Sequence, residues 1–583
     1  MLSFAPHYLG ENAPTTIIYG MKAVGLALHL LVGLLVLAIL RMLSEFVEFR
    51  GCTQYADPKL KQGDWLLPVI CAGLWLLHPL QVSTTMYVVQ RMAILAALFT
   101  LAAIAIFVYL RMSWARRQPT LEEVAVGGVW IATLTLLSVL SKENGILTIP
   151  LIAVLELCIF AGVINRKTRK SLVALAGLMV FAIPLVLSMV FFLQPESIVA
   201  GYSSRSFTFY ERIMSEVVIL KDYLGWLIFP DIEAYSFNHD NVRVVSSATD
   251  LELRWSLALI VAMLVGSASV ARKYPFFLCG ALFFFVGHSL ESTVLPLELQ
   301  FEHRNYLPSF GIVLMVYQLL KILDDAQPRR VLILVSLMMV LLLSLQLGLR
   351  SLRWSNEYIL TSHLAESEEA SYRSLTDHAA AMIRGPLAIV PVNIADNAMY
   401  RESLIELRSV LDRANAKDPS LTTHLSLELL VSLAINEDIV EVDRIFKRLE
   451  EVLSLRDLIS DDIRSLEAIV SMGQEAFCDT ICIEMIDRLL VVVQKRNPKS
   501  PLPVQYALVL AEHTENPEMR LRWLSYGQQM TVKKVESTLA FGAAMKAGER
   551  GEALEILREA VSDDAKLLGM STYRDAVHAI WDY

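Results

Sequence analysis

The sequence predicts an all-α protein in two parts, a polytopic membrane helix bundle over residues 1–350 and a soluble domain of helical hairpins over residues 351–583. Hydrophobic residues make up 55% of the chain, which excludes an ordinary soluble protein. The charge balance changes where the apolar runs end. Residues 1–350 carry 26 Lys and Arg against 23 Asp and Glu, whereas residues 351–583 carry 25 against 37. The two parts are therefore built for two different solvents.

Ten apolar segments are predicted to cross the bilayer as helices. They lie near residues 22–42, 65–80, 92–111, 124–140, 145–163, 171–193, 255–271, 276–290, 306–323 and 331–349. Alternate loops hold the clusters of Lys and Arg, so the positive-inside rule places those loops in the cytoplasm. The outer side then receives the loop at 78–90, the turn at Lys142, the 194–254 loop, the segment at Glu302 and everything after Arg350.

The orientation holds only if the segment Tyr210–Phe229 does not span the membrane. This segment is amphipathic and carries five charges, at Glu211, Arg212, Glu216, Lys221 and Asp222. Such a pattern is typical of a helix that lies on a membrane surface. We therefore expect an interfacial helix on the outer face.

Three polar elements interrupt the apolar pattern on the outer side, at residues 78–91, 142–144 and 302–308. Ionisable groups at a bilayer boundary are costly, so they are candidates for function. Arg91, Lys142 and Arg304 together are suited to grip a phosphate or pyrophosphate, Arg as a two-pronged fork and Lys as a point charge. Glu143 and Glu302 are expected to balance these cations or to handle a proton.

The alternative is that each of these residues is a span-end side chain reaching toward lipid headgroups or neutralising its neighbour. Three such elements on one face favour a site over that interpretation. His29 and His288, each alone in an apolar span, are predicted to be hydrogen-bonded core residues. The other histidines and the six cysteines have no metal-ligand or redox spacing, so we predict no metal site.

The order of these motifs resembles a known family. In the membrane half of the tetratricopeptide-bearing O-mannosyltransferase-like proteins, which belong to the C-type glycosyltransferase superfamily, similar motifs follow one another in the same order. The matching motifs here are His78-Pro79, Val88-Val89-Gln90-Arg91, Lys142-Glu143-Asn144-Gly145 and Glu302-His303-Arg304-Asn305-Tyr306-Leu307-Pro308-Ser309. The resemblance covers most of residues 1–375.

The resemblance implies a C-type glycosyltransferase-like bundle that uses a polyprenyl-phosphate-linked sugar at the outer face. Neither the resemblance nor the sequence identifies a cofactor. The residues carried over as candidates for the donor site are His78, Gln90, Arg91, Lys142, Glu143, Glu302, His303 and Arg304. None of them is assigned as the catalytic residue.

The chain departs from the family pattern at its start. Inverting enzymes of the family rely on an acidic residue in the first outer loop, after a first span, whereas only Glu11 precedes the first predicted span here. Without a positioned base an acceptor hydroxyl is not activated. Two expectations follow. Either the true start lies upstream of Met1, or the chain is a shortened and catalytically inactive relative.

Residues 351–583 show helical periodicity and repeated hairpins. The hairpins are predicted at 425–453, whose second helix is Ile439–Leu453, at 506–529 and at 538–561. The most tetratricopeptide-like hairpin runs from Ala540 to Ala560 through a Gly-containing turn. Stacked hairpins would form a periplasmic solenoid with a concave surface for a protein acceptor or an envelope partner. A non-repetitive helical bundle that only supports the membrane half is the alternative. The acidic balance argues against nucleic acid as a partner.

Two functions from different classes follow. The first is a protein-glycosylating enzyme of a bacterial inner (cytoplasmic) membrane, which moves sugar from a polyprenyl-phosphate carrier to a protein or glycan acceptor. In this reading membrane lipid surrounds the bundle and residues 351–583 are periplasmic. The second is a catalytically inactive envelope scaffold or protein-docking module.

Overall fold

The computed structural model describes residues 14–51, 65–160, 201–366 (except 203–204, 206, 240–241 and 294), 370–384, 398–417, 425, 439–455, 487–492 and 495. These residues form helices and connecting loops without a strand, as the sequence predicts. The chain divides into two compact units, Met1–His363 and Leu364–Tyr583. Each unit is described by itself.

Several helices of the first unit are apolar enough to cross a membrane, so this is a membrane protein. Six reach full span length within the described residues, and two more are shorter. The long ones are α1 (Pro14–Gly51), α4 (Arg91–Arg116), α5 (Leu121–Ser141), the continuous stretch Glu143–Phe160 that contains α6 (Thr148–Leu155), α10 (Leu251–Val270) and α13 (Arg329–Arg353). The short ones are α2 (Leu66–Leu76) and α11 (Pro275–His288).

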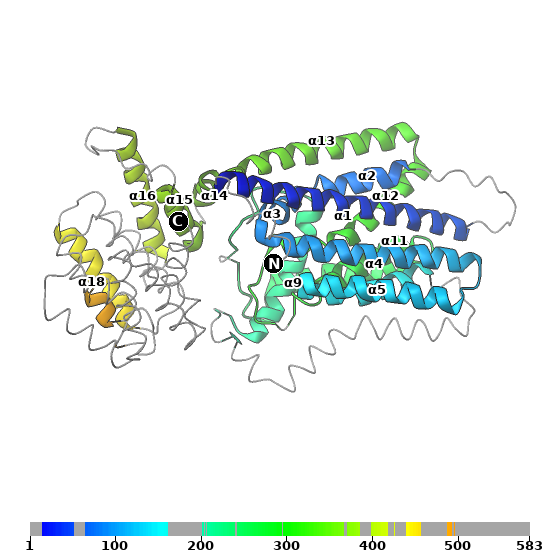
Figure 1. The fold of residues 1–583 in the computed structure, drawn as a ribbon, viewed down its shortest axis with the longest axis horizontal. Coiled ribbons are helices and arrows are strands. Elements are labelled where there is room, and N and C mark those ends of the chain that lie inside the picture. Colours follow the sequence, from blue (N-terminus) through cyan, green and yellow to red (C-terminus); the bar gives the residue numbers. More distant parts are fainter. Residues whose placement is uncertain are drawn as a thin grey trace, which may run out of the picture. The chain divides into compact units, whose positions relative to one another are not determined.

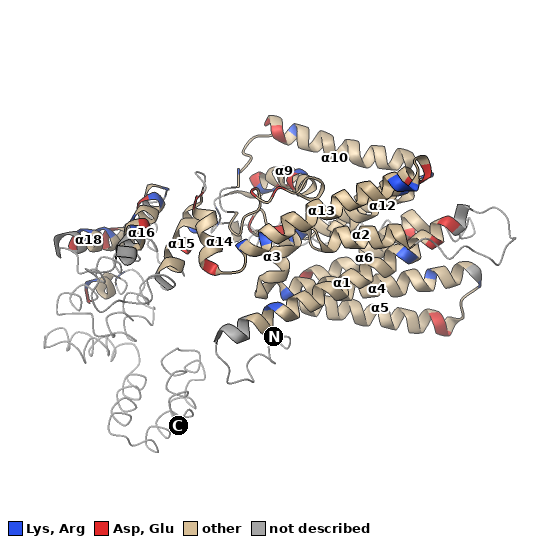
Figure 2. Cartoon of the chain, turned by 90° about the horizontal axis from the view of Figure 1, so that it is seen from above, with Lys and Arg blue, Asp and Glu red and all other residues tan. Residues whose placement is uncertain are grey.

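Nine of the ten predicted spans coincide with described helices, including α12 (Ser309–Ala326). The remaining predicted span, at 171–193, lies outside the described residues. Only 11% of the most apolar part of α5 and of α13 is buried, against 61% for Glu143–Phe160. Helices α5 and α13 therefore expose apolar side chains at the periphery of the bundle, where lipid would contact them. Figure 2 shows the charged residues near the helix ends, with the middle of the bundle free of them.

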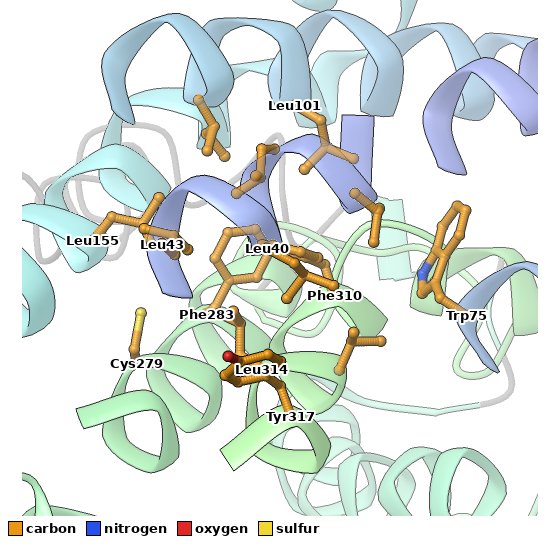
Figure 3. Packing of buried hydrophobic residues seen from close by; sticks show 14 of the residues in the cluster. Leu40, Leu43, Trp75, Leu101, Leu155, Cys279, Phe283, Phe310, Leu314 and Tyr317 are labelled. Carbon is orange, nitrogen blue, oxygen red and sulfur yellow. The ribbon is translucent and has the colours of Figure 1, made fainter. Parts of the chain in front are cut away.

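The helices of the bundle run side by side around α1, as Figure 1 shows. Leu40 and Leu43 of α1 pack among Leu101 of α4, Phe283 of α11 and Phe310 of α12 (Figure 3). These side chains are nearly inaccessible and form the main core. The core fixes the helix ends that carry the polar elements.

Glycines allow α11 and α12 to approach closely. A Cβ atom on Gly280 would lie 2.3 Å from the carbonyl oxygen of Gly311, and one on Gly311 would lie 2.4 Å from that of Gly280. Close backbone contact through small residues is a common way for helices to pack in membranes, where no hydrophobic force drives helix association.

The amphipathic segment forms α9 (Phe209–Ile228), which lies crosswise to the long helices (Figures 1 and 2). Its polar side is placed differently from the prediction. Arg212 and Glu216 are buried inside the protein, whereas Tyr210, Ile213 and Ile228 are exposed. The loop after α11 covers these two charges, since Arg212 donates to the carbonyl oxygens of Glu291 and Thr293. The position of α9 at a membrane surface stays a prediction.

In the second unit, α15 (Tyr372–Arg384) packs against α16 (Ala398–Lys417), and α18 spans Ile439–Leu455. The predicted helix at Ile439–Leu453 corresponds to α18. The hairpins predicted at 506–529 and 538–561 lie outside the described residues. Helix α14 (Glu357–Glu366) precedes α15 in the chain.

Candidate functional site

The turn that carries Lys142 is held by backbone contact and hydroxyl hydrogen bonds. Helix α5 ends at Ser141, Lys142 is extended, and the 3₁₀ helix Glu143–Leu147 leads directly into α6. The hydroxyl of Thr100 on α4 lies 2.9 Å from that of Ser138 and 2.8 Å from that of Thr148. This network joins α4, α5 and α6 just below the turn. Lys142 is consequently held with its side chain buried.

Lys142 contacts a carboxylate that lies outside the sequence motifs. Its Nζ donates to Glu291 Oε1 at 2.7 Å, and both side chains are buried. The other oxygen of Glu291 lies 3.8 Å from Nε of Arg304. Burial alone would raise the pKa of Glu291, but Lys142 and Arg304 lower it to about 2. Glu291 is therefore a carboxylate that bridges two of the predicted site residues.

Arg304 lies on the 3₁₀ helix Glu302–Asn305 and is nearly inaccessible. Its guanidinium donates to the carbonyl oxygens of Leu299 at 2.7 Å and Glu298 at 2.6 Å. Beside it, burial and then the positive charge of Lys142 lower the pKa of His303 to about 3. His303 is consequently neutral and adds no charge to the site.

Helix α9 contributes the second half of the cluster. Arg212 and Glu216, one turn apart, form an ion pair of 2.8 Å, and Glu216 lies 3.9 Å from Arg304. Burial raises the pKa of Glu216 to about 7, although both arginines act in the opposite direction. The spacing of Arg212 and Glu216 by four residues was a signal in the sequence. The sequence indicated only an amphipathic helix there and gave no sign that its charges are buried.

Five buried side chains thus form one connected chain of charges: Lys142, Glu291, Arg304, Glu216 and Arg212. Three cations face two carboxylates, which leaves one surplus positive charge among the described residues. Protonation of Glu216 raises the surplus to two. An unbalanced buried charge is expensive, so this cluster favours a bound anion.

A second polar contact lies nearby. Arg350, at the end of α13, forms an ion pair with Glu302 and donates to the carbonyl oxygen of Pro79 at 2.9 Å. Its guanidinium also lies over the ring of Tyr235, 4.3 Å from the centroid. Arg350 therefore joins the first and third predicted polar elements. Arg350 was not among the predicted site residues, because an arginine at the end of a span is expected to contact lipid headgroups.

Two cavities lie among the helices that carry these charges. The larger has a volume of about 490 Å³ and lies between α2, α12, α13 and the end of α9. Its walls are mainly apolar, with Leu74, Val313, Met339 and Leu343 among them, and His78 adds a polar group. A volume of this size lies in the usual range for small-molecule sites.

The smaller cavity has a volume of about 30 Å³ and is lined by Lys142, His303 and Arg304 among others. Such a space holds about one or two water molecules. A phosphate group does not fit there unless the surrounding side chains move.

The structure brings together some of the predicted site residues and separates others. Lys142, His303 and Arg304 share the small cavity. His78 lines the large cavity, and Glu302 pairs with Arg350.

The remaining three predicted residues lie elsewhere. Gln90 is buried at the start of α4, and Glu143 is exposed. Arg91 donates to the carbonyl oxygen of Met21 in α1 at 2.8 Å. Lys142 and Arg304 therefore meet at Glu291, while Arg91 braces α1 against α4.

The two core histidines are as predicted. Nδ1 of His29 is hydrogen-bonded to the hydroxyl of Tyr306 at 2.8 Å, and Nδ1 of His288 lies 3.0 Å from the carbonyl oxygen of Phe284. In the part of the chain that the structure describes, no group of three His, Cys, Asp or Glu side chains is placed to hold a metal ion.

No family model, curated protein or solved structure matches this chain. The family resemblance stated from the motifs therefore stays a prediction.

Proposed function

We propose that the chain is a membrane glycosyltransferase-like protein that moves a sugar from a polyprenyl-phosphate-linked donor to a protein or glycan acceptor. The observation that carries the proposal is the surplus of buried positive charge at Lys142, Arg304 and Arg212, in a helix bundle that also holds a large apolar cavity. A lipid with a phosphate head and a hydrocarbon chain has the chemistry that matches both features.

Three residues connect the cavity with the charges. Gln346 lines the cavity and lies one helical turn before Arg350, which contacts Glu302. Glu302 shares its 3₁₀ helix with Arg304. A hydrocarbon chain in the cavity would therefore direct its phosphate toward this group of cations.

The two features would contribute differently to donor binding. The hydrocarbon chain of the donor enters the cavity from surrounding lipid rather than from water. Its transfer therefore yields little hydrophobic free energy and mainly orients the donor. The cations would stabilise the negative charge that develops on the phosphate as the bond between sugar and oxygen breaks. Binding requires that Glu291 moves away from Lys142 and Arg304, since the cavity that these two cations line is too small for a phosphate.

The setting of this activity is part of the proposal. The protein would lie in a bacterial inner membrane with its charge cluster on the outer side, and residues 351–583 would form a periplasmic tetratricopeptide-like domain that presents the acceptor. The helical pair α15 and α16 supports a helical-hairpin domain. Attachment of a membrane-impermeant thiol reagent to a cysteine introduced after His363 in whole cells tests this orientation, and labelling only from inside contradicts it.

A second candidate function is an inactive envelope scaffold. The observation that favours it is that the cations of the cluster already contact carboxylates or carbonyl oxygens, so the structure holds together without a ligand.

The test is binding and turnover by the purified full-length protein. A polyprenyl phosphate is titrated into protein in lipid nanodiscs and its occupancy is measured by native mass spectrometry. Met339→Trp fills the cavity and is expected to reduce occupancy. Leu341→Trp, on the exposed face of the same helix, is the control.

The charge cluster is tested in the same assay. Lys142→Ala with Arg304→Ala is expected to abolish binding, and unchanged binding discards the site assignment. Occupancy without any sugar release from a glycosylated donor favours the scaffold.

A further inference from the structure

The segment between α11 and the 3₁₀ helix Glu302–Asn305 has no regular structure, yet it carries Glu291 at the centre of the charge cluster. Carbonyl groups in an irregular buried segment need donors from elsewhere in the protein. The source of those donors decides what holds Glu291 in place.

A single side chain supplies several of them. The guanidinium of Arg212 donates from Nη2 to the carbonyl oxygen of Glu291 at 2.7 Å, from Nε to that of Thr293 at 2.9 Å, and from Nη1 to that of Leu297. Arg212 is completely buried. Arginine is suited to this role because its donors point in fixed directions within one plane.

Two neighbours on α9 act on the same region. Glu216 forms an ion pair with Arg212 at 2.8 Å, through the same Nη2 that donates to the carbonyl oxygen of Glu291. Seven residues further along α9, the hydroxyl of Tyr223 accepts a hydrogen bond from the backbone N–H of Phe301 at 2.8 Å. Helix α9 therefore fixes both ends of the segment from Glu291 to Phe301.

We propose that Arg212 is a positioning residue for the anion site. It fixes the backbone of Glu291, whose carboxylate in turn sets the relative placement of Lys142 and Arg304. The link is direct, because the residue whose carbonyl Arg212 holds is the residue whose carboxylate bridges the two cations. The role in ligand binding rests on the proposed function, whereas the role in placing Glu291 does not.

Arg205 offers a matched control. It is also an arginine that donates to a carbonyl of this segment, from Nε to Pro296 at 2.9 Å, but it is partly exposed. The carboxylate that it faces is Glu298, at 4.0 Å, which lies outside the charge cluster. Arg205→Gln therefore removes a similar hydrogen bond without touching Glu291.

The first experiment measures the reactivity of Lys142 toward an amine-acylating reagent in the full-length protein without ligand, read by peptide mass spectrometry. In Arg212→Gln we expect faster acylation of Lys142, because Glu291 no longer holds its ammonium in place. Lys22, which donates to the carbonyl oxygen of Trp354 at 3.2 Å, is the internal reference. A selective increase at Lys142 supports positioning, whereas an equal increase at both lysines indicates general unfolding and overturns the proposal. Unchanged Lys142 in Arg212→Gln also overturns it.

The variant Arg212→Lys separates charge from geometry. It keeps a cation beside Glu216 but cannot donate in the same three directions. Lys142 is expected to stay as reactive in Arg212→Lys as in Arg212→Gln. Full protection of Lys142 in Arg212→Lys means that charge alone suffices, which overturns the geometric role.

The second experiment measures the affinity of each folded variant for a polyprenyl phosphate. Arg212→Gln is expected to bind roughly tenfold more weakly than Arg205→Gln, since hydrogen bonds to charged groups are among the strongest of the protein. Equal affinities in the two variants overturn the role in binding. Absence of binding by the unmodified protein refutes the proposed function instead, and the acylation experiment still decides whether Arg212 places Glu291.

Discussion

Gly145 controls the turn that presents Lys142, and replacing it with alanine is a strong perturbation of the site. A Cβ atom there would lie 2.2 Å from the carbonyl carbon of Ser138 and 2.3 Å from the backbone nitrogen of Val139. Ordinary contact begins near 3.4 Å, so the backbone at Gly145 and the backbone of α5 must move apart by about 1.2 Å. Both obstacles are main-chain atoms of α5, and neither can rotate away.

The displacement has a stability effect and a local effect. Overpacking of this kind reduces the free energy of unfolding by about 1–3 kcal/mol. The turn also loses the geometry by which the hydroxyl of Thr148 donates to the carbonyl oxygen of Gly145 at 2.8 Å. Lys142, three residues earlier, is then expected to lose its 2.7 Å contact with Glu291.

The assay compares Gly145→Ala with Gly128→Ala in detergent, by the thermal unfolding midpoint and by acylation of Lys142. Gly128 lies on α5, the helix that Gly145 contacts, and a Cβ on Gly128 meets nothing within 4 Å. We expect a lower midpoint and faster acylation only in Gly145→Ala. Equal behaviour of the two variants refutes the reasoning that backbone contact fixes this turn.

Three further variants test other parts of the argument. Because burial raises the pKa of Glu216 from 4.5 to about 7, its contribution to stability is full below pH 4.5 and is lost as the pH rises through 7, by about 3 kcal/mol in total. Glu216→Gln should remove this pH dependence of the unfolding midpoint. Gly311→Ala places a Cβ 2.4 Å from a carbonyl oxygen of α11, whereas Gly266→Ala meets nothing within 4 Å. Only the first should lower the midpoint, by about 1–3 kcal/mol in free energy. Arg350→Met leaves a buried carboxylate without its cation and should destabilise the fold by about 3–5 kcal/mol, measured by denaturant unfolding.

Each of these has a result that contradicts it. The same slope of stability against pH between 4.5 and 7 in Glu216→Gln and the unmodified protein contradicts the assignment of that titration. Glu291 does not interfere, because its lowered pKa places its own loss of stability below pH 4.5. Equal midpoints for the two glycine variants contradict close packing of α11 on α12. A small effect of Arg350→Met shows that water reaches Glu302.

The helices of the membrane half could be predicted because their signal is local. A run of about 20 apolar residues specifies a span without reference to any other part of the chain. The amphipathic helix α9 was found for the same reason. Its orientation could not be predicted, because the sequence pattern of a charged helix face is the same whether water or a buried loop covers that face.

The partners within the site depend on contacts between distant segments. Lys142 and Glu291 are 149 residues apart in the chain, and Arg350 and Glu302 are 48 apart. Motif order indicated Lys142 and Arg304 but gave no means to choose Glu291 as the residue between them. The sequence also grouped Arg91 with these cations, while its guanidinium donates into α1.

The two carboxylates of the cluster are suited to different parts in anion binding. A phosphate that reaches Lys142 and Arg304 competes with Glu291 for them, because the cavity that these cations line is too small to hold a phosphate as it stands. Glu291, with a pKa near 2, stays ionised at any physiological pH and must therefore move off Lys142 and Arg304. Glu216, with a pKa near 7, can accept a proton where it stands. Because Glu216 also orients Arg212, which holds the backbone of Glu291, proton uptake at α9 and displacement of Glu291 act on the same hydrogen-bonded chain. Anion binding is therefore coupled to protonation of Glu216 on α9, a helix that contributes none of the residues identified from the motifs.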